Sequence, residues 1–212
     1  MNKHTLYPIF LSISGKPCFI IGGGPVAYRK ACDLFDADAD ITVVAENPSQ
    51  EIVGLSESGR IRLKIKRFEP DDIEEAFLVF AATDDSSVNA LIAETAERNG
   101  TLINVVDTPE LCGFFSGAVV KRGPLKIAIS TGGCSPGTAR QIRKELEDLY
   151  PESYCDFIET AGEMRHYILS QENISPGEKK SALSWLSRKE SRKLFFQDGK
   201  ERMWEELKKL IR

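Results

Sequence analysis

The sequence is poor in the residues that most often build metal centres and disulfide frameworks. It has two histidines and five cysteines in 212 residues, and no two cysteines form a C-x-x-C pair. An odd number of cysteines without paired spacing argues against a disulfide scaffold or a thiolate zinc site, and is typical of a reducing compartment. No combination of His, Asp and Glu has the spacing of metal ligands. We therefore expect no resident metal and a cytoplasmic location.

Long apolar runs and an excess of positive charge are also missing. The apolar stretch at residues 6–11 is short and contains Pro8, so it fits neither a signal peptide nor a membrane span. We expect it to be an extended segment that packs against the first strand. Lysine and arginine number 28 against 32 acidic residues, for a net charge of -4. No global basic field indicates a nucleic-acid or membrane partner, and we expect neither.

A glycine-rich turn is the most informative feature that the chain does have. An apolar strand at 18–21 leads into three glycines, and Pro25 stands where a helix would begin. The spacing matches G-x-G-x-x-G/A, in which the first glycine permits a tight turn, the second admits a pyrophosphate and the small third residue packs helix on strand. The helix N-terminus would then hold the diphosphate. The predicted cofactor-binding residues here are Gly22, Gly23, Gly24, Pro25, Val26 and Ala27.

Strand-like and helix-like segments alternate over the first hundred residues. This pattern predicts an α/β fold, a Rossmann-like domain with a parallel sheet covered by helices on both faces. Later, two strand-like runs at 114–120 and 125–130 are separated by a short turn and predict a hairpin. Helical patterns follow at 136–149, 153–170, 178–188 and 200–212. We expect an NAD-binding domain at 1–113, a strand-rich dimerisation segment at 114–150 and a helical C-terminal domain at 151–212.

Polar residues follow the predicted strands, where ligands of open α/β sheets lie. Glu46, followed by Asn47, stands about twenty positions beyond the glycines, where a carboxylate binds the adenosine ribose; no arginine adjoins it in the sequence, which favours NAD over NADP. Thr83 and Asp84 follow another strand and are expected near the ribose or nicotinamide. The alternatives are that Glu46 is a solvated loop carboxylate and that Asp84 or Asp85 caps the next helix.

Asp107 follows the last predicted strand of the first domain directly. A carboxylate at this place can accept or donate a proton. Its alternative role is to form the turn that leads into Pro109. Both histidines lie outside the segments that are predicted to form the crevice, so we do not expect a histidine to act as the general base.

Four motifs in the same order and spacing resemble those of the precorrin-2 dehydrogenases, a family that includes the N-terminal module of siroheme synthase and its stand-alone relatives. The resemblance covers about residues 6–150 and is looser in the C-terminal helices. The motifs are Gly22–Lys30, Phe80–Asp85 with Asn89, Asn104–Asp107, and Ser130–Pro136 with Ala139 and Arg140.

The resemblance implies oxidation of precorrin-2 to sirohydrochlorin with NAD⁺ as acceptor, and in some members insertion of Fe²⁺ to give siroheme. It implies a homodimer, with residues 114–150 forming much of the interface. The catalytic aspartate of the family corresponds to Asp107, and a position that is often serine in the family is Thr131 here.

The implied substrate carries many carboxylates, which arginines and helix N-termini bind well. Ser135 and Arg140 are therefore expected to bind it, with Arg143 and Lys144 on the same helix, and the resemblance links the position of Thr131 to substrate binding as well. The alternative is that these basic residues form a solvated helix face. Two other functions are alternatives to this one: a dehydrogenase of another small substrate, and a module that senses NADH.

Overall fold

The computed structural model of the chain describes residues 5–211 and divides into two compact units, Met1–Ser116 and Gly117–Arg212. Each unit has its own hydrophobic core. The three-part division at 113 and 150 stays a prediction.

The first unit is built on a parallel sheet, as the alternating pattern predicted. Its strand order is β3-β2-β1-β4-β5, and every neighbouring pair is parallel. The connections run outward from β1 in one direction and from β4 in the other, so the strand order switches between β1 and β4. The strands are β1 (Pro17–Ile21), β2 (Asp40–Ala45), β3 (Arg62–Ile65), β4 (Leu78–Ala81) and β5 (Leu102–Val105).

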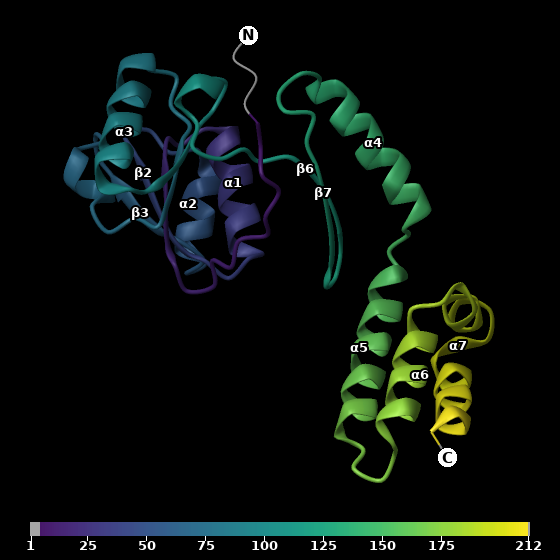
Figure 1. The fold of residues 1–212 in the computed structure, drawn as a ribbon. Coiled ribbons are helices and arrows are strands. Elements are labelled where there is room, and N and C mark those ends of the chain that lie inside the picture. The colour runs from purple at the N-terminus through teal and green to yellow at the C-terminus, as the bar shows by residue number, and fades with distance from the viewer. Residues whose placement is uncertain (1–4, 212) are drawn as a thin grey trace. The chain divides into compact units, whose positions relative to one another are not determined.

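Helices cover both faces of this sheet, because successive residues of each strand point to opposite sides. One buried cluster joins Ile20 and Val43 to α1 (Pro25–Phe35) and α2 (Gln50–Glu57). The other joins Ile21 and Val44 to α3 (Ser86–Asn99) and to the 3₁₀ turn η1 (Pro70–Ile73). Figure 1 shows α1 and α2 on one side of the strands and α3 on the other. The Rossmann-like architecture is confirmed.

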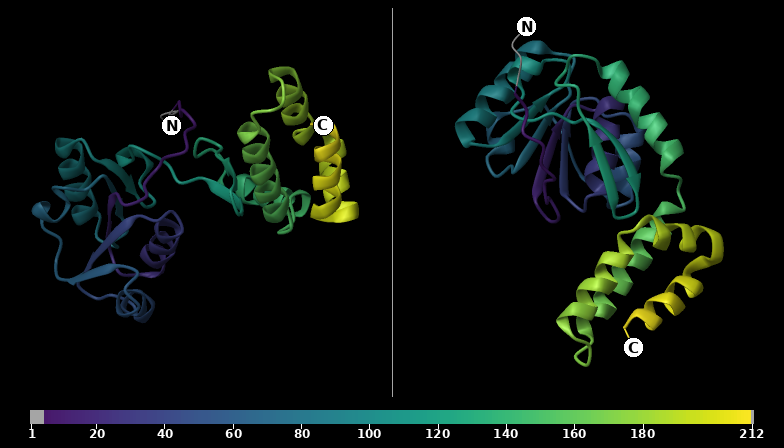
Figure 2. Two further views of the ribbon diagram at one scale, coloured as in Figure 1. Left: turned by 90° about the horizontal axis from the view of Figure 1, so that it is seen from below. Right: turned by 45° about the vertical axis from the view of Figure 1, so that its right-hand side comes forward.

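The second unit combines a hairpin with four helices (Figure 2). Strands β6 (Ala118–Arg122) and β7 (Leu125–Ile129) pair antiparallel, which confirms the predicted hairpin. After α4 (Pro136–Leu149), an apolar core joins α5 (Tyr154–Ser170), α6 (Pro176–Leu186) and α7 (Lys189–Leu210) around Met164, Ile168, Met203 and Leu207, which are fully buried.

One sequence expectation is wrong and another is incomplete. The segment at 6–11 does not bury its apolar side chains, since Tyr7 is 87% and Phe10 75% exposed. The expected helix from Lys200 is present, but α7 also contains an unexpected helical stretch that begins at Lys189. The two meet at a kink at Gly199, whose φ of 87° departs from helical values. The expected end of that helix at Arg212 lies outside the described residues. Among residues 5–211, no helix is long and apolar enough to cross a membrane.

Candidate functional site

The carboxyl ends of four neighbouring strands bring the predicted cofactor residues to one edge of the first unit. In the sheet register Ile21 lies between Val44 and Ala81, and Ala81 pairs with Val105. The loops that follow these strands therefore begin next to one another at the carboxyl edge of the sheet. They include the glycine turn, Glu46, Thr83 and Asp107, beside the switch in strand order where α/β proteins bind ligands.

The three glycines differ in what surrounds them. Gly22 has a φ of +127°, and a Cβ there would lie 2.2 Å from the Ala82 carbonyl oxygen. A Cβ on Gly23 would lie 2.7 Å from the Cα of Pro48. The first two glycines are thus required by the packing of the turn against the segments after β4 and β2. The role of Gly23 was not evident from the spacing, because Pro48 is distant in sequence.

Gly24 has open space around it instead. Apart from its chain neighbours, no atom of residues 5–211 would lie within 4 Å of a Cβ at this position, and its backbone is extended with φ -87°. It is the N-cap of α1, Pro25 occupies the first turn, and Ala27 is fully buried against the sheet. The N–H groups of this helix terminus face no capping side chain among the described residues. The turn therefore fits a diphosphate, which needs free N–H donors and close access to the backbone.

Glu46 does have an arginine beside it, contrary to the sequence expectation. Arg67 Nε donates to Glu46 Oε2 over 3.1 Å, and the two side chains are 85% and 52% exposed. Ala45 and Ile65 are register partners at the ends of β2 and β3, which places the two following segments side by side. Asn47 is exposed in the same loop and its carbonyl lies near Gly23. The expectation that no arginine adjoins Glu46, which favoured NAD over NADP, is therefore wrong.

Thr83 and its neighbours form a hydrogen-bonded start to α3. Thr83 Oγ1 donates to Asn89 Oδ1 over 2.8 Å, and Asn89 Nδ2 donates to the Thr83 carbonyl over 2.9 Å. Asp85 is the N-cap and accepts from the N–H groups of Ser87 and Val88; hydrogen bonds from Ser87 and Val88 lower the pKa of Asp85. Capping thus falls to Asp85, which leaves the exposed Asp84 at the sheet edge without this task.

Asp107 is exposed and lies at the tip of the turn after β5. Its φ is +60°, a left-handed conformation that is uncommon for residues other than glycine. Val106 N donates to the Ala81 carbonyl, and Thr108 N donates to the Val105 carbonyl, so the residues on either side are held. Backbone of this kind often marks a functional position. The turn-forming and catalytic roles of Asp107 are therefore compatible.

Cys112 stabilises the turn of Asp107 through hydrogen bonds to backbone groups. The spacing of the sequence motifs did not predict this role. The Cys112 Sγ accepts from Val105 N at 3.2 Å, and its one S–H lies within donating distance of two carbonyls, those of Val105 and Thr108. Burial, the largest cause, raises the pKa of this thiol, which keeps it protonated and able to donate. Asn104 Nδ2 donates to the Phe114 carbonyl over 2.9 Å and fixes the chain that follows.

The predicted substrate residues gather at the start of α4 in the second unit. Thr131 Oγ1 accepts from Ser135 N over 3.1 Å, and Ser135 Oγ lies 2.7 Å from Thr138 Oγ1. Arg140 is exposed. Arg143 is paired with Glu147 one turn along the helix, so it is less free to bind a ligand.

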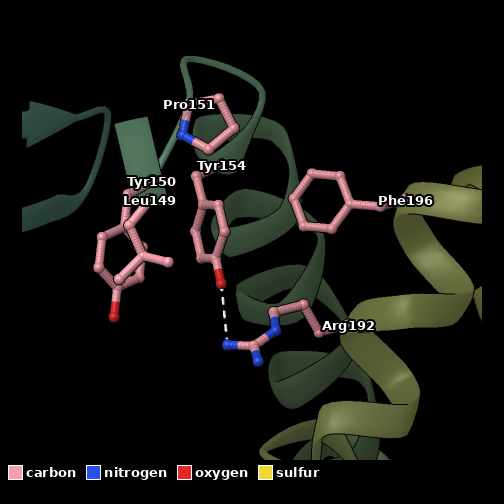
Figure 3. A pocket seen from close by; sticks show the side chains of 6 residues that line it. All are labelled: Leu149, Tyr150, Pro151, Tyr154, Arg192 and Phe196. Atoms are coloured by element: carbon pink, nitrogen blue, oxygen red, sulfur yellow. Dashed lines mark hydrogen bonds between the residues drawn. The ribbon is translucent and has the colours of Figure 1, made fainter. Parts of the chain in front are cut away.

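A cavity of about 390 Å³ also lies in the second unit, away from the predicted site residues in sequence (Figure 3). Tyr154 and Phe196 line it, and Arg192 Nη1 donates to Tyr154 Oη over 2.9 Å. These contacts join α5 to α7.

Ligand-type atoms of Cys155, Asp156 and Glu159 lie within 4.8 Å of one another near the start of α5. The Cys155 thiol donates to Glu159, and desolvation followed by this bond raises the pKa of the thiol. The arrangement favours the protonated thiol over the thiolate that a metal requires.

Comparison with known families agrees with this geometry. Residues 9–118 match a family described as putative NAD(P)-binding, and residues 122–149 match one described as the central part of a sirohaem biosynthesis protein. The two matches fall almost entirely in the first and second units respectively.

Individual relatives point the same way. The siroheme synthase of Methylococcus capsulatus is 45% identical over 161 residues, which cover 76% of this chain and 34% of the relative. That of Methylobacillus flagellatus is 38% identical over 173 residues, or 82% of this chain and 37% of the relative. The chain thus spans about a third of the length of these curated relatives. A solved structure named SirC, precorrin-2 dehydrogenase, is 28% identical with a TM-score of 0.82, covering 96% of this chain and all of that chain.

Proposed function

Because this chain belongs to the putative NAD(P)-binding family and carries the motifs of its precorrin-2 dehydrogenases, we propose that it oxidises precorrin-2 to sirohydrochlorin with NAD⁺. The observation that carries the proposal is the meeting of an open glycine turn and Asp107 at one edge of a parallel sheet. It is an oxidoreductase of siroheme biosynthesis.

The chain's own contribution to cofactor binding lies in the turn after β1. Gly24 leaves room for the diphosphate, and the N-terminal N–H groups of α1 donate to it. Glu46 and Asn47 lie where the adenosine ribose binds, and Thr83 and Asp84 lie toward the nicotinamide side. NAD⁺ supplies the hydride acceptor that the reaction needs.

Asp107 handles the proton. Removing two hydrogens from the macrocycle releases a hydride and a proton, and the Asp107 carboxylate accepts the proton. Its exposure leaves it open to a substrate, and the hydrogen bonds of Val106, Thr108 and Cys112 hold its turn in place. If Fe²⁺ enters as a second substrate, the same carboxylate takes the two pyrrole N–H protons one after the other and passes each to water, which gives a ferrochelatase activity.

The second unit supplies the substrate's anchors in this proposal. Thr131, Ser135 and Arg140 bind acetate or propionate carboxylates at the start of α4, where the helix terminus adds its positive end. We further propose a homodimer that uses residues 114–150, and a cytoplasmic location, for which the five free cysteines speak.

Anaerobic incubation of the chain with precorrin-2 and NAD⁺, with and without Fe²⁺, tests the function. We expect NADH and sirohydrochlorin to form together. Asp107→Asn should lower turnover by ~10²–10⁴-fold, because the amide cannot accept a proton. NAD⁺ affinity should not change, and asparagine tolerates the left-handed backbone.

Asp38→Asn is a matched control, since Asp38 also has a positive φ, 59°, but lies in the turn before β2. It should keep full activity. Near-normal turnover in Asp107→Asn would remove this carboxylate from the reaction, and no NADH from the unmodified chain would refute the function itself.

A further inference from the structure

The contact between Glu46 and Arg67 is a feature that a site for NAD alone does not require. A carboxylate after the second strand accepts hydrogen bonds from the ribose hydroxyls of NAD, and repels the 2′-phosphate of NADP. Here a guanidinium lies against that carboxylate, with Arg67 Nε 3.1 Å from Glu46 Oε2. The cation comes from the loop after β3, twenty-one positions along the chain.

We propose that Arg67 forms a subsite for the 2′-phosphate, so that this chain accepts NADP(H) as well as NAD(H), with Glu46 and Arg67 setting the preference between them. The proposal rests on the nucleotide lying at the glycine turn, as in the proposed function.

The position of the pair supports this assignment. The Ser49 N–H donates to the Gly23 carbonyl over 2.9 Å, which joins the loop of Glu46 directly to the glycine turn. Lys66 N donates to the Ala45 carbonyl, which joins the loop of Arg67 to the end of β2. Both side chains are thus anchored through their backbones beside the place where a diphosphate fits, and they extend into solvent.

The chemistry of Arg67 also suits a phosphate. Its Nε is the only group of the guanidinium that bonds to another described residue, so its terminal NH₂ groups are available as a planar pair of donors. An exposed ion pair is weak, so exchanging the carboxylate for a doubly charged phosphate requires little. The neighbouring Lys66 is already committed to Glu69 and Asp72 and does not compete.

Calorimetric titration of the full chain with NAD⁺ and NADP⁺ at low ionic strength tests the proposal without reference to turnover. The unmodified chain should bind both nucleotides. Arg67→Gln should weaken NADP⁺ binding about tenfold or more and change NAD⁺ binding less than about threefold, as expected for a lost hydrogen-bonded charge. Glu46→Gln should have the opposite effect, tightening NADP⁺ and weakening NAD⁺.

Arg62→Gln provides the matched control. Arg62 lies at the start of β3, where it pairs with Asp40 at 2.7 Å, so its loss removes the same charge at the opposite end of this strand and leaves the carboxyl edge unchanged. It should leave the ratio of the two affinities unchanged. Circular dichroism should show that all three variants are folded.

The outcomes separate the subsite from the function beneath it. An unchanged affinity ratio in Arg67→Gln, or no NADP⁺ binding by the unmodified chain, would overturn the subsite while NAD⁺ binding upholds the nucleotide site. If neither nucleotide binds, both the subsite and the proposed function fail.

Discussion

In each unit a helix begins after a turn that contains glycines, but the two turns differ in how tightly they are packed. In the first, α1 starts after a glycine turn that is packed so tightly that Gly22 and Gly23 have no room for a Cβ. In the second, α4 starts after Gly132 and Gly133, which have positive φ values of 60° and 81° but open space around them. The first turn is fixed by its neighbours on both sides. The second is held by a few local hydrogen bonds, such as that between Ser135 N and Thr131 Oγ1.

This difference matches the two ligands that we propose. A dinucleotide presents the same diphosphate at every turnover, so a rigid row of donors suits it. A tetrapyrrole with many flexible carboxylates is better met by exposed hydroxyls and arginine side chains that adjust to it. The comparison therefore predicts that matched changes in the two turns affect different ligands.

Adding a carboxylate to each helix start is the strongest test of this comparison. Gly24→Asp places a negative charge where the diphosphate lies, so NAD⁺ binding should be lost in calorimetry. The chain should still fold, because Gly24 has an ordinary backbone conformation and open space. Gly137→Asp makes the same change in the first turn of α4, where a Cβ would also meet no other described part of the chain within 4 Å beyond its own helix backbone. It should keep NAD⁺ binding and weaken binding of sirohydrochlorin.

Equal loss of NAD⁺ binding in both variants would mean that the effect is general destabilisation. Unchanged NAD⁺ affinity in Gly24→Asp would remove the cofactor from this turn. Gly22→Ala is a useful reference, since its Cβ would meet the Ala82 carbonyl and it should disturb the turn itself.

Sequence reasoning predicted the parts of this site that lie close together along the chain. The turn at 22–27 follows a strand and opens a helix, so about ten consecutive residues are enough to predict a nucleotide-binding turn. Arg67 was missed because its contact with Glu46 depends on the register of β2 and β3, which spacing does not encode. Cys112 was missed for a related reason, since its thiol acts on backbone groups of the preceding strand.

The errors in the fold have physical causes as well. Hydrophobicity suggested that residues 6–11 pack against the sheet, but apolar character alone names no partner, and these side chains are exposed in the chain by itself. Residues 189–198 carry many charges and little apolar periodicity, so their helix was not expected. It forms because Ser191 is fully buried and bonds to the Leu186 carbonyl, while Leu194 and Phe195 join the core of the second unit.

Separate cores predict that a cavity in one unit leaves the other intact. Met164 is fully buried among α5, α6 and α7, and Met164→Ala should lower the free energy of unfolding of the second unit by ~2–5 kcal/mol. Both tryptophans of the chain, Trp185 and Trp204, belong to this core, so their fluorescence in urea reports its unfolding.

NAD⁺ affinity in Met164→Ala should match that of the unmodified chain in the absence of urea. Ile92→Ala is the counterpart, because Ile92 is fully buried between α3 and the sheet. It should weaken the first unit and shift the tryptophan transition less. A tryptophan midpoint that falls equally in both variants would show that the two units unfold as one.

The smallest expected effect is the loss, at low pH, of the stabilisation that two carboxylates give to the helix starts at which they lie. Hydrogen bonds from Ser87 and Val88 lower the pKa of Asp85 at the start of α3, and those from Ser175 lower the pKa of Glu178 in the capping box of α6. A carboxyl whose pKa falls on folding stabilises the folded state above its unfolded pKa, ~3.9 for aspartate and ~4.3 for glutamate. That stabilisation is lost as the pH drops through the lower, folded value.

Asp85→Asn and Glu178→Gln keep a hydrogen-bond acceptor and remove the charge. Each should therefore reduce amide-exchange protection slightly in its own helix at pH 6, and the difference from the unmodified chain should vanish toward pH 3.

Because Asp85 stands beside Thr83 and Asp84, only its variant should also weaken NAD⁺ binding measurably at pH 6. A difference that persists at pH 3 would mean that the change acts through packing, and an effect of Glu178→Gln on NAD⁺ would show that the second unit's helices communicate with the nucleotide site.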